Sequence, residues 1–210
     1  MANQKHTQDP LDLDEAMSAS EAFIIKYKNK FLIGIAAIVI VVGGFLGYKN
    51  FISEPNEIKA AEALFKGEQY FGNSSYEIAL NGDSLGYEGF LKVADEFSGT
   101  DAGELANAYA GICYAQLGQY ENAVKYLNKF SADDHLVSPA ILGTMGNCYA
   151  QLGELDKAAA TLVKAADKAN SHALSPIYLI QAGQIYEKLG KNSEAVNAYK
   201  AIKDKYFNSY

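Results

Sequence analysis

Apolar residues recur at every third or fourth position through most of the C-terminal half of the chain, in paired segments separated by a glycine. The first pair covers about Gly103–Gln116 and Gln119–Phe130, with Gly118 between them. This spacing is typical of helices, and glycine suits a left-handed helix end, where a Cβ atom is penalised. Ser138-Pro139 and Ser175-Pro176 open the next two pairs and favour serine-capped helix starts. The pattern therefore predicts consecutive hairpins of antiparallel helices.

The hairpin recurs with a period of about 35 residues, over roughly 104–138, 139–175 and 176–209. Four positions repeat in all three units: a first-helix glycine and tyrosine, a turn glycine and a second-helix alanine. They are Gly111, Gly146 and Gly183; Tyr114, Tyr149 and Tyr186; Gly118, Gly153 and Gly190; and Ala123, Ala158 and Ala195. The small residues are expected where the two helices of a hairpin approach closely. Such a period marks a stacked array of helical hairpins, so we predict an all-α solenoid.

These residues resemble the tetratricopeptide repeat (TPR) family, whose first-helix glycine and tyrosine, turn glycine and second-helix alanine they match. The family's turn aromatic is present only as Tyr120, with Leu155 and Asn192 at the equivalent later positions, and the chain has no tryptophan. The resemblance implies a TPR-like α-solenoid that binds other macromolecules. An unrelated alanine-rich helical bundle is the alternative.

In TPR-like arrays the first helix of each hairpin lines a concave groove. By helical phase the candidates are Leu105, Ala108, Ile112, Gln116, Gly143, Asn147, Gln151, Ile180, Gln184 and Glu187. Most are small, apolar or amide-bearing, which suits an extended or helical apolar segment of a partner. The first two hairpins offer no basic residue there, so capture of a peptide's terminal carboxylate is not expected. The alternative is that the chain's own C-terminus covers the groove.

A second pattern lies near the N-terminus, where Phe31–Gly47 is an unbroken run without a charge or an amide side chain. With Tyr48 it approaches the roughly 20 residues that cross a bilayer, so we predict a transmembrane helix spanning about 31–48 within a helical segment 21–52. A cleavable signal peptide is the alternative, but the run begins late and no small-residue cleavage site follows it.

Lysines flank this run unequally, with Lys26, Lys28 and Lys30 before it and Lys49 alone after it. The lysine-rich side of a span stays cytoplasmic, which predicts a cytoplasmic N-terminus and exported repeats. Residues 1–20 are polar and acidic and are predicted to be a disordered cytoplasmic tail. Ser18 and Glu21 have the spacing of a capping box that would open the membrane helix.

Between the span and the repeats, residues 53–103 are less regular. Asn56–Phe71 and Tyr87–Phe97 have helical spacing, and a turn-rich insert occupies about 73–86. We interpret this part as a degenerate N-terminal hairpin with a loop insert that caps the array. The Tyr76–Leu80 part of the insert is a further candidate contact surface.

Composition narrows the range of functions. The net charge is −7 and all 18 basic residues are lysine. From Ser53 onward the chain has 13 lysines and 20 acidic residues. An acidic surface without arginine argues against nucleic acid. Cys113 and Cys148 occupy equivalent places in successive repeats, too far apart for a disulfide, and are expected to be buried free thiols. No catalytic, metal-binding, cofactor-binding or small-molecule site is recognisable, so we predict a protein that is not an enzyme.

The whole arrangement of short cytoplasmic tail, lysine-flanked span and exported TPR domain resembles the YfgM-like family, ancillary partners of the Sec translocon. That resemblance implies a bacterial inner-membrane protein with a periplasmic TPR domain. Its implied partners are translocon subunits, periplasmic chaperones or client polypeptides in secretion. A TPR adaptor for cell-envelope assembly or division, without a role in secretion, is the alternative function. An enzyme or sensor with unrecognised chemistry is the third.

Overall fold

In the computed structural model, residues 13–207 are described, and their regular structure is entirely helical, which confirms the predicted all-α class. The elements are α1 (Leu13–Tyr48), the π-helical turn η1 (Lys49–Ser53), α2 (Glu54–Gly72), α3 (Tyr76–Asn81), α4 (Phe90–Glu96), α5 (Asp101–Gln116), α6 (Tyr120–Leu127), α7 (Val137–Gln151), α8 (Leu155–Ala169), α9 (Ser175–Lys188) and α10 (Asn192–Lys205). The chain divides into two compact units between Ile52 and Ser53.

The first unit contains α1, which belongs to the one helical stretch among the described residues that is long and apolar enough to cross a membrane. Its apolar side chains, from Phe31 to Leu46, are exposed within the structure. The helix begins at Leu13, so the predicted disorder of 13–20 and the capping box at Ser18 are wrong. The sequence from Leu11 to Ile33 lacks glycine and proline, and this allows the helix to extend toward the N-terminus. The rest of the predicted tail, 1–12, lies outside the described residues.

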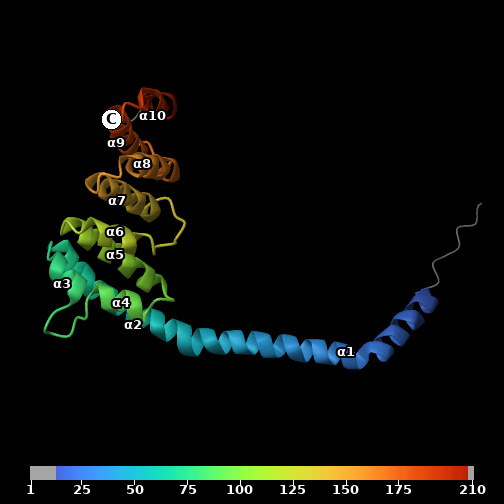
Figure 1. Ribbon diagram of the computed structural model, residues 1–210. Coiled ribbons are helices and arrows are strands. Elements are labelled where there is room, and N and C mark those ends of the chain that lie inside the picture. Colours follow the sequence, from blue (N-terminus) through green and yellow to red (C-terminus); the bar gives the residue numbers. More distant parts are fainter. Residues whose placement is uncertain (1–12, 208–210) are drawn as a thin grey trace, which may run out of the picture. The chain divides into compact units, whose positions relative to one another are not determined.

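The second unit contains the helical hairpins α5/α6, α7/α8 and α9/α10, which stack in chain order (Figure 1). Within each hairpin the two helices pack against each other, and the second helix of one hairpin packs against the first helix of the next. The predicted α-solenoid is therefore present.

The repeated small residues lie where the helices of each hairpin meet. A Cβ atom on Gly111 would lie 2.5 Å from Cγ of Leu127, and one on Gly146 would lie 2.7 Å from Cγ of Leu162. Ala123, Ala158 and Ala195 are at most 2% exposed. Because real Cβ atoms do not approach carbon atoms this closely, a larger side chain would push the two helices apart.

The turn glycines follow the first helix of each hairpin. Gly118 has φ +75°, with nearly equal values at Gly153 and Gly190. This left-handed conformation carries no Cβ penalty for glycine, and it lets the chain reverse direction within two or three residues. The three turns are thus alike in sequence and in backbone geometry.

The two Ser-Pro pairs lie in the first turn of α7 and α9, but their serines do not cap these helices. Ser175 Oγ donates a hydrogen bond to the Ala166 carbonyl at 2.7 Å and accepts one from the Ser171 amide at 2.9 Å. Ser138 likewise donates to a carbonyl oxygen six residues earlier, at Ala132. The predicted serine caps are therefore wrong, since both hydroxyls form hydrogen bonds with the segment that precedes the helix instead.

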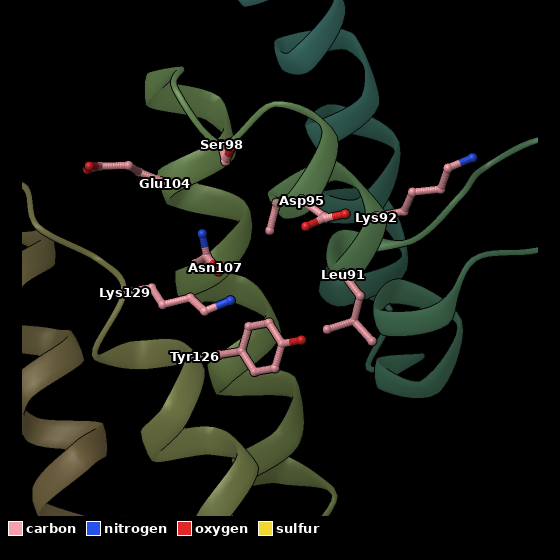
Figure 2. A pocket seen from close by; sticks show the side chains of 9 residues that line it. Leu91, Lys92, Asp95, Ser98, Glu104, Asn107, Tyr126 and Lys129 are labelled. Atoms are coloured by element: carbon pink, nitrogen blue, oxygen red, sulfur yellow. The ribbon is translucent and has the colours of Figure 1, made fainter.

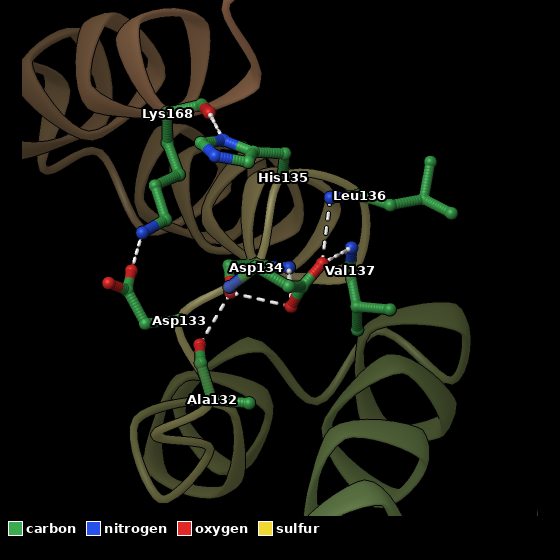
Figure 3. Close-up of polar contacts among 8 residues, drawn as sticks. Ala132, Asp133, Asp134, His135, Leu136, Val137 and Lys168 are labelled. Carbon is green, nitrogen blue, oxygen red and sulfur yellow. Dashed lines mark hydrogen bonds and ion pairs between the residues drawn. The ribbon is translucent and has the colours of Figure 1, made fainter.

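Asp134 performs the capping role at α7 (Figure 3). Its carboxylate accepts hydrogen bonds from the amides of Leu136 and Val137, at 2.7 and 2.5 Å, and from both the amide and the hydroxyl of Ser138. Burial raises the pKa of Asp134, but these hydrogen bonds outweigh it and lower the pKa to about 2. Beside it, Asp133 pairs with Lys168 of α8. The loop between α6 and α7 is thus bound to both helices of the hairpin that follows it.

The segment before the repeats has a core of its own. Phe90 is fully buried, stacked on Tyr109 of α5 with ring centroids 5.0 Å apart. Glu57 of α2 accepts hydrogen bonds from the amides of Asp101 and Ala102, the first two residues of α5. The segment therefore covers the first repeat, as a capping element does.

The predicted loop at Tyr76–Leu80 is wrong, because these residues form helix α3. Ala79 and Leu80 are buried in the same core as Phe90. The stretch that follows is held by Asp83, whose carboxylate accepts hydrogen bonds from the Leu85 amide at 2.7 Å, the Tyr87 amide at 2.9 Å and the Tyr70 hydroxyl. Burial of α3 against the core explains why this short segment is helical despite its turn-rich flanks.

Candidate functional site

The predicted groove residues fall into two groups by exposure. Six are exposed on the first helices of the hairpins and come from α5, α7 and α9. They are Gln116, Asn147, Gln151, Ile180, Gln184 and Glu187. Four of the six carry amide side chains, which can both donate and accept hydrogen bonds.

The other four predicted groove residues take part in packing. Ala108 is 4% exposed and lies in a cluster with Leu127, Ile141 and Met145, against which half-buried Ile112 packs. Gly143 is buried, and a Cβ there would lie 2.5 Å from Cε1 of Tyr178.

Leu105, the fourth, is half-buried against the core of the N-terminal segment. These contacts show that helical phase alone overstated how much of each first helix faces outward.

Clefts lie elsewhere in this unit, at the interfaces that involve the second helices of the hairpins. A cleft of about 640 Å³ lies among α4, α5 and α6, lined by Leu91, Asp95, Asn107, Tyr126 and Lys129 together with four neighbours (Figure 2). Smaller clefts of about 330 and 240 Å³ lie among α6, α7 and α8 and among α8, α9 and α10. None of these three clefts is lined by a predicted groove residue.

Sequence reasoning missed the largest of these clefts, which we name the α4–α6 cleft. One signal was available: Asn107 stands one residue before Ala108 and one turn before Gly111, on a helix face that also carries the small residues Gly103 and Ala110. An amide in such a position is unusual, because burying a polar group without a partner costs free energy.

The two thiols are suited to packing rather than to chemistry. Cys113 and Cys148 are free and buried, as predicted. Burial raises the pKa of Cys113 to about 12 and that of Cys148 to about 11, so both stay protonated at neutral pH. Within the described part of the chain, no three histidine, cysteine or acidic side chains gather as a metal site would require.

Comparison with known proteins places the repeats in a class. The tetratricopeptide repeat family model matches residues 110–130, 139–167 and 177–203, one segment for each of the hairpins α5/α6, α7/α8 and α9/α10. A search of curated proteins finds no match to the chain. The chain therefore carries tetratricopeptide repeats, a type of protein–protein interaction module, after one N-terminal helix long and apolar enough to cross a membrane. The narrower resemblance to the YfgM-like family has no matching relative behind it.

Proposed function

We propose that this protein is a membrane-anchored scaffold that binds partner polypeptides along the first-helix surface of its repeats. The observation that carries the proposal is the presence of exposed amide side chains on each of the three first helices, Gln116 on α5, Asn147 on α7 and Gln184 on α9. Repeat arrays use such extended surfaces to bind macromolecules.

The chemistry of this surface suits a polypeptide. An extended peptide presents alternating N–H and C=O groups, and an amide side chain can pair with either. Ile180 adds an apolar contact at 43% exposure. No lysine occupies the predicted groove positions on α5 and α7, so anionic ligands such as nucleic acid find no counter-charge in the first two hairpins.

We further propose that α1 anchors the chain in a bacterial inner membrane with the repeats in the periplasm. The three lysines before the span, against Lys49 after it, support this orientation. A scaffold so placed could serve the Sec translocon by holding secretory clients or periplasmic chaperones. The resemblance in overall arrangement supports that finer assignment.

Topology provides the first prediction. Alkaline phosphatase fused after Tyr210 should be active in bacterial cells, because that enzyme folds only after export, whereas green fluorescent protein exported through Sec at the same position should be dark. Replacing Lys26, Lys28 and Lys30 with glutamine should weaken the orientation and lower phosphatase activity. A bright fluorescent fusion with an inactive phosphatase fusion would reverse the orientation and exclude the periplasmic role.

The second prediction concerns the binding surface. A photo-crosslinking amino acid at Gln151 or Gln184 of the full chain should capture the same set of polypeptides in living cells. Asn147→Glu should reduce that capture at least about tenfold, because the added charge must be buried unpaired against an apolar ligand segment. Immunoblots of the crosslinked products would measure the effect.

The matched control is Asn122→Glu, since Asn122 is an exposed asparagine on the second helix α6. This change should leave capture intact. Equal capture by the two glutamate variants would show that partners bind elsewhere. The identity of the captured proteins separates a role in secretion from one in envelope assembly, because only the former includes translocon subunits or secretory clients.

A further inference from the structure

The α4–α6 cleft contains a buried hydrogen-bond acceptor without a partner. Asn107, on α5, is only 7% exposed, and its Nδ2 donates to the Gly103 carbonyl at 3.1 Å. Its Oδ1 atom is buried and has no hydrogen-bond partner. An unsatisfied buried acceptor destabilises a fold, so its retention at a cleft points to a ligand that supplies an N–H or O–H donor.

The charges around this acceptor favour a cationic donor. Asp95 directs its carboxylate into the cleft (Figure 2), and no hydrogen bond or ion pair engages it within the described residues. Lys92, on the same helix, also lines the cleft, but its amine is paired with Glu88 (Figure 2). Asp95 and Asn107 thus both line the space that a positively charged group would fill.

An aromatic ring completes the surroundings of that space. Tyr126, on α6, has the amine of Lys129 at 4.5 Å from its ring centroid and that of Lys125 at 5.9 Å, distances typical of cation–π attraction. The ring face therefore already accommodates a cation from within the chain. Lys129 is exposed and lies two residues beyond the end of α6, so an incoming cation can displace it at small cost.

We propose that the α4–α6 cleft binds a basic side chain, the ammonium of lysine or the guanidinium of arginine, of a partner polypeptide. The bound group donates to Oδ1 of Asn107, lies opposite the carboxylate of Asp95 and replaces the amine of Lys129 over Tyr126. Because Oδ1 is buried in the resting cleft, the side chains around it have to move before the ligand reaches it. The proposal rests on the proposed function in that the ligand is a polypeptide, but it adds a second site apart from the first-helix surface.

The test uses the full chain in nonionic detergent micelles and a capped five-residue peptide of alanine, one lysine and one photo-leucine. After irradiation, mass spectrometry locates the labelled residues and measures the yield. We expect labelling on α4, α5 and α6 around the cleft, and about tenfold less with norleucine in place of lysine, which is the effect of losing one hydrogen bond to a charged group.

Three variants are expected to change the labelling yield, two of them downward and one upward. Asp95→Asn and Asn107→Leu should each lower the yield several-fold, whereas Lys129→Met should raise it, because the nearer of the two cations over the Tyr126 ring is gone. Lys164→Met, an equal change of charge at an exposed position on α8, should have no effect. Asn107→Leu should also raise the melting temperature, since it removes an unsatisfied buried acceptor. If this variant unfolds the chain instead, the labelling yield of the surface variant Asp95→Asn tests the proposal.

Equal labelling by the lysine and norleucine peptides would overturn the proposal. A lower yield for Lys129→Met would overturn it as well, because the cleft would then need Lys129 to hold its ligand. Labelling confined to the surroundings of Asn147 and Gln184 would leave the proposed function standing while removing this second site. Absence of labelling in the cleft while cellular capture through Gln184 persists would have the same meaning.

Discussion

Replacing Phe90 with alanine is expected to destabilise the repeat unit by about 3–5 kcal/mol, the cost of removing a fully buried aromatic ring. Phe90 is 0% exposed and stacks on Tyr109, with Tyr87 edge-on at 6.3 Å between centroids. Its removal leaves a cavity between the N-terminal segment and α5, a site that cannot collapse without moving a helix. Melting temperature should fall on the order of 10 °C.

The measurement is thermal unfolding of the full chain in micelles by near-ultraviolet circular dichroism. This signal reports on the repeat unit because 13 of the 15 tyrosines follow Ile52. Phe207→Ala is the matched control, since Phe207 is 74% exposed and should tolerate the same change. If both variants have the melting temperature of the wild type, the N-terminal segment is not part of the cooperative unit and does not cap the repeats.

The repeats could be predicted from the sequence because the residues that define them act through short-range sterics. Gly111 is followed sixteen residues later by Leu127, and these two positions meet wherever the turn between them is tight. Gly118 supplies the left-handed conformation in that turn. The same constraints recur at each hairpin. The three copies together therefore fix how the repeats align with one another, although each copy alone is a weak signal.

The N-terminal segment could not be predicted in the same way. Helix α3 has six residues, too few to show a 3.6-residue period, and asparagine and glycine flank it. Its helical form depends on burial of Ala79 and Leu80 against helices that are distant in sequence. The caps were misassigned for a similar reason, because the loop conformation brings Asp134 to the start of α7 in place of Ser138.

The exposure of the candidate site residues was predicted only in part. Helical phase shows which residues share a face of one helix, but it does not show which of them a neighbouring helix covers. Asn147 and Gln184 are exposed, but Gly143, one turn before Asn147, is covered by Tyr178. This matters for experiments on the surface. A glutamate at half-buried Ile112 would disturb the cluster around Met145, so loss of binding there would not separate fold from function.

Ala158→Leu tests the hairpin register directly and is expected to destabilise the repeat unit by about 1–3 kcal/mol. Ala158 is 0% exposed, and a Cβ atom on Gly146 of the facing helix would lie 3.3 Å from the Ala158 carbonyl oxygen. The backbones of α7 and α8 are therefore in close contact at this point. Three additional carbon atoms can be accommodated only by separating the two helices or by strained side-chain conformations.

Ala160→Leu is the control, because Ala160 is exposed two residues further along α8 and leucine is nearly as good a helix former as alanine. Thermal unfolding of the full chain should show a fall of several degrees for Ala158→Leu and almost none for Ala160→Leu. The opposite order would mean that α8 is rotated from the register that aligns Ala158 with Ala123 and Ala195. Because α8 packs against α7 and α9, the exposed surfaces of those two first helices would then have to be assigned again.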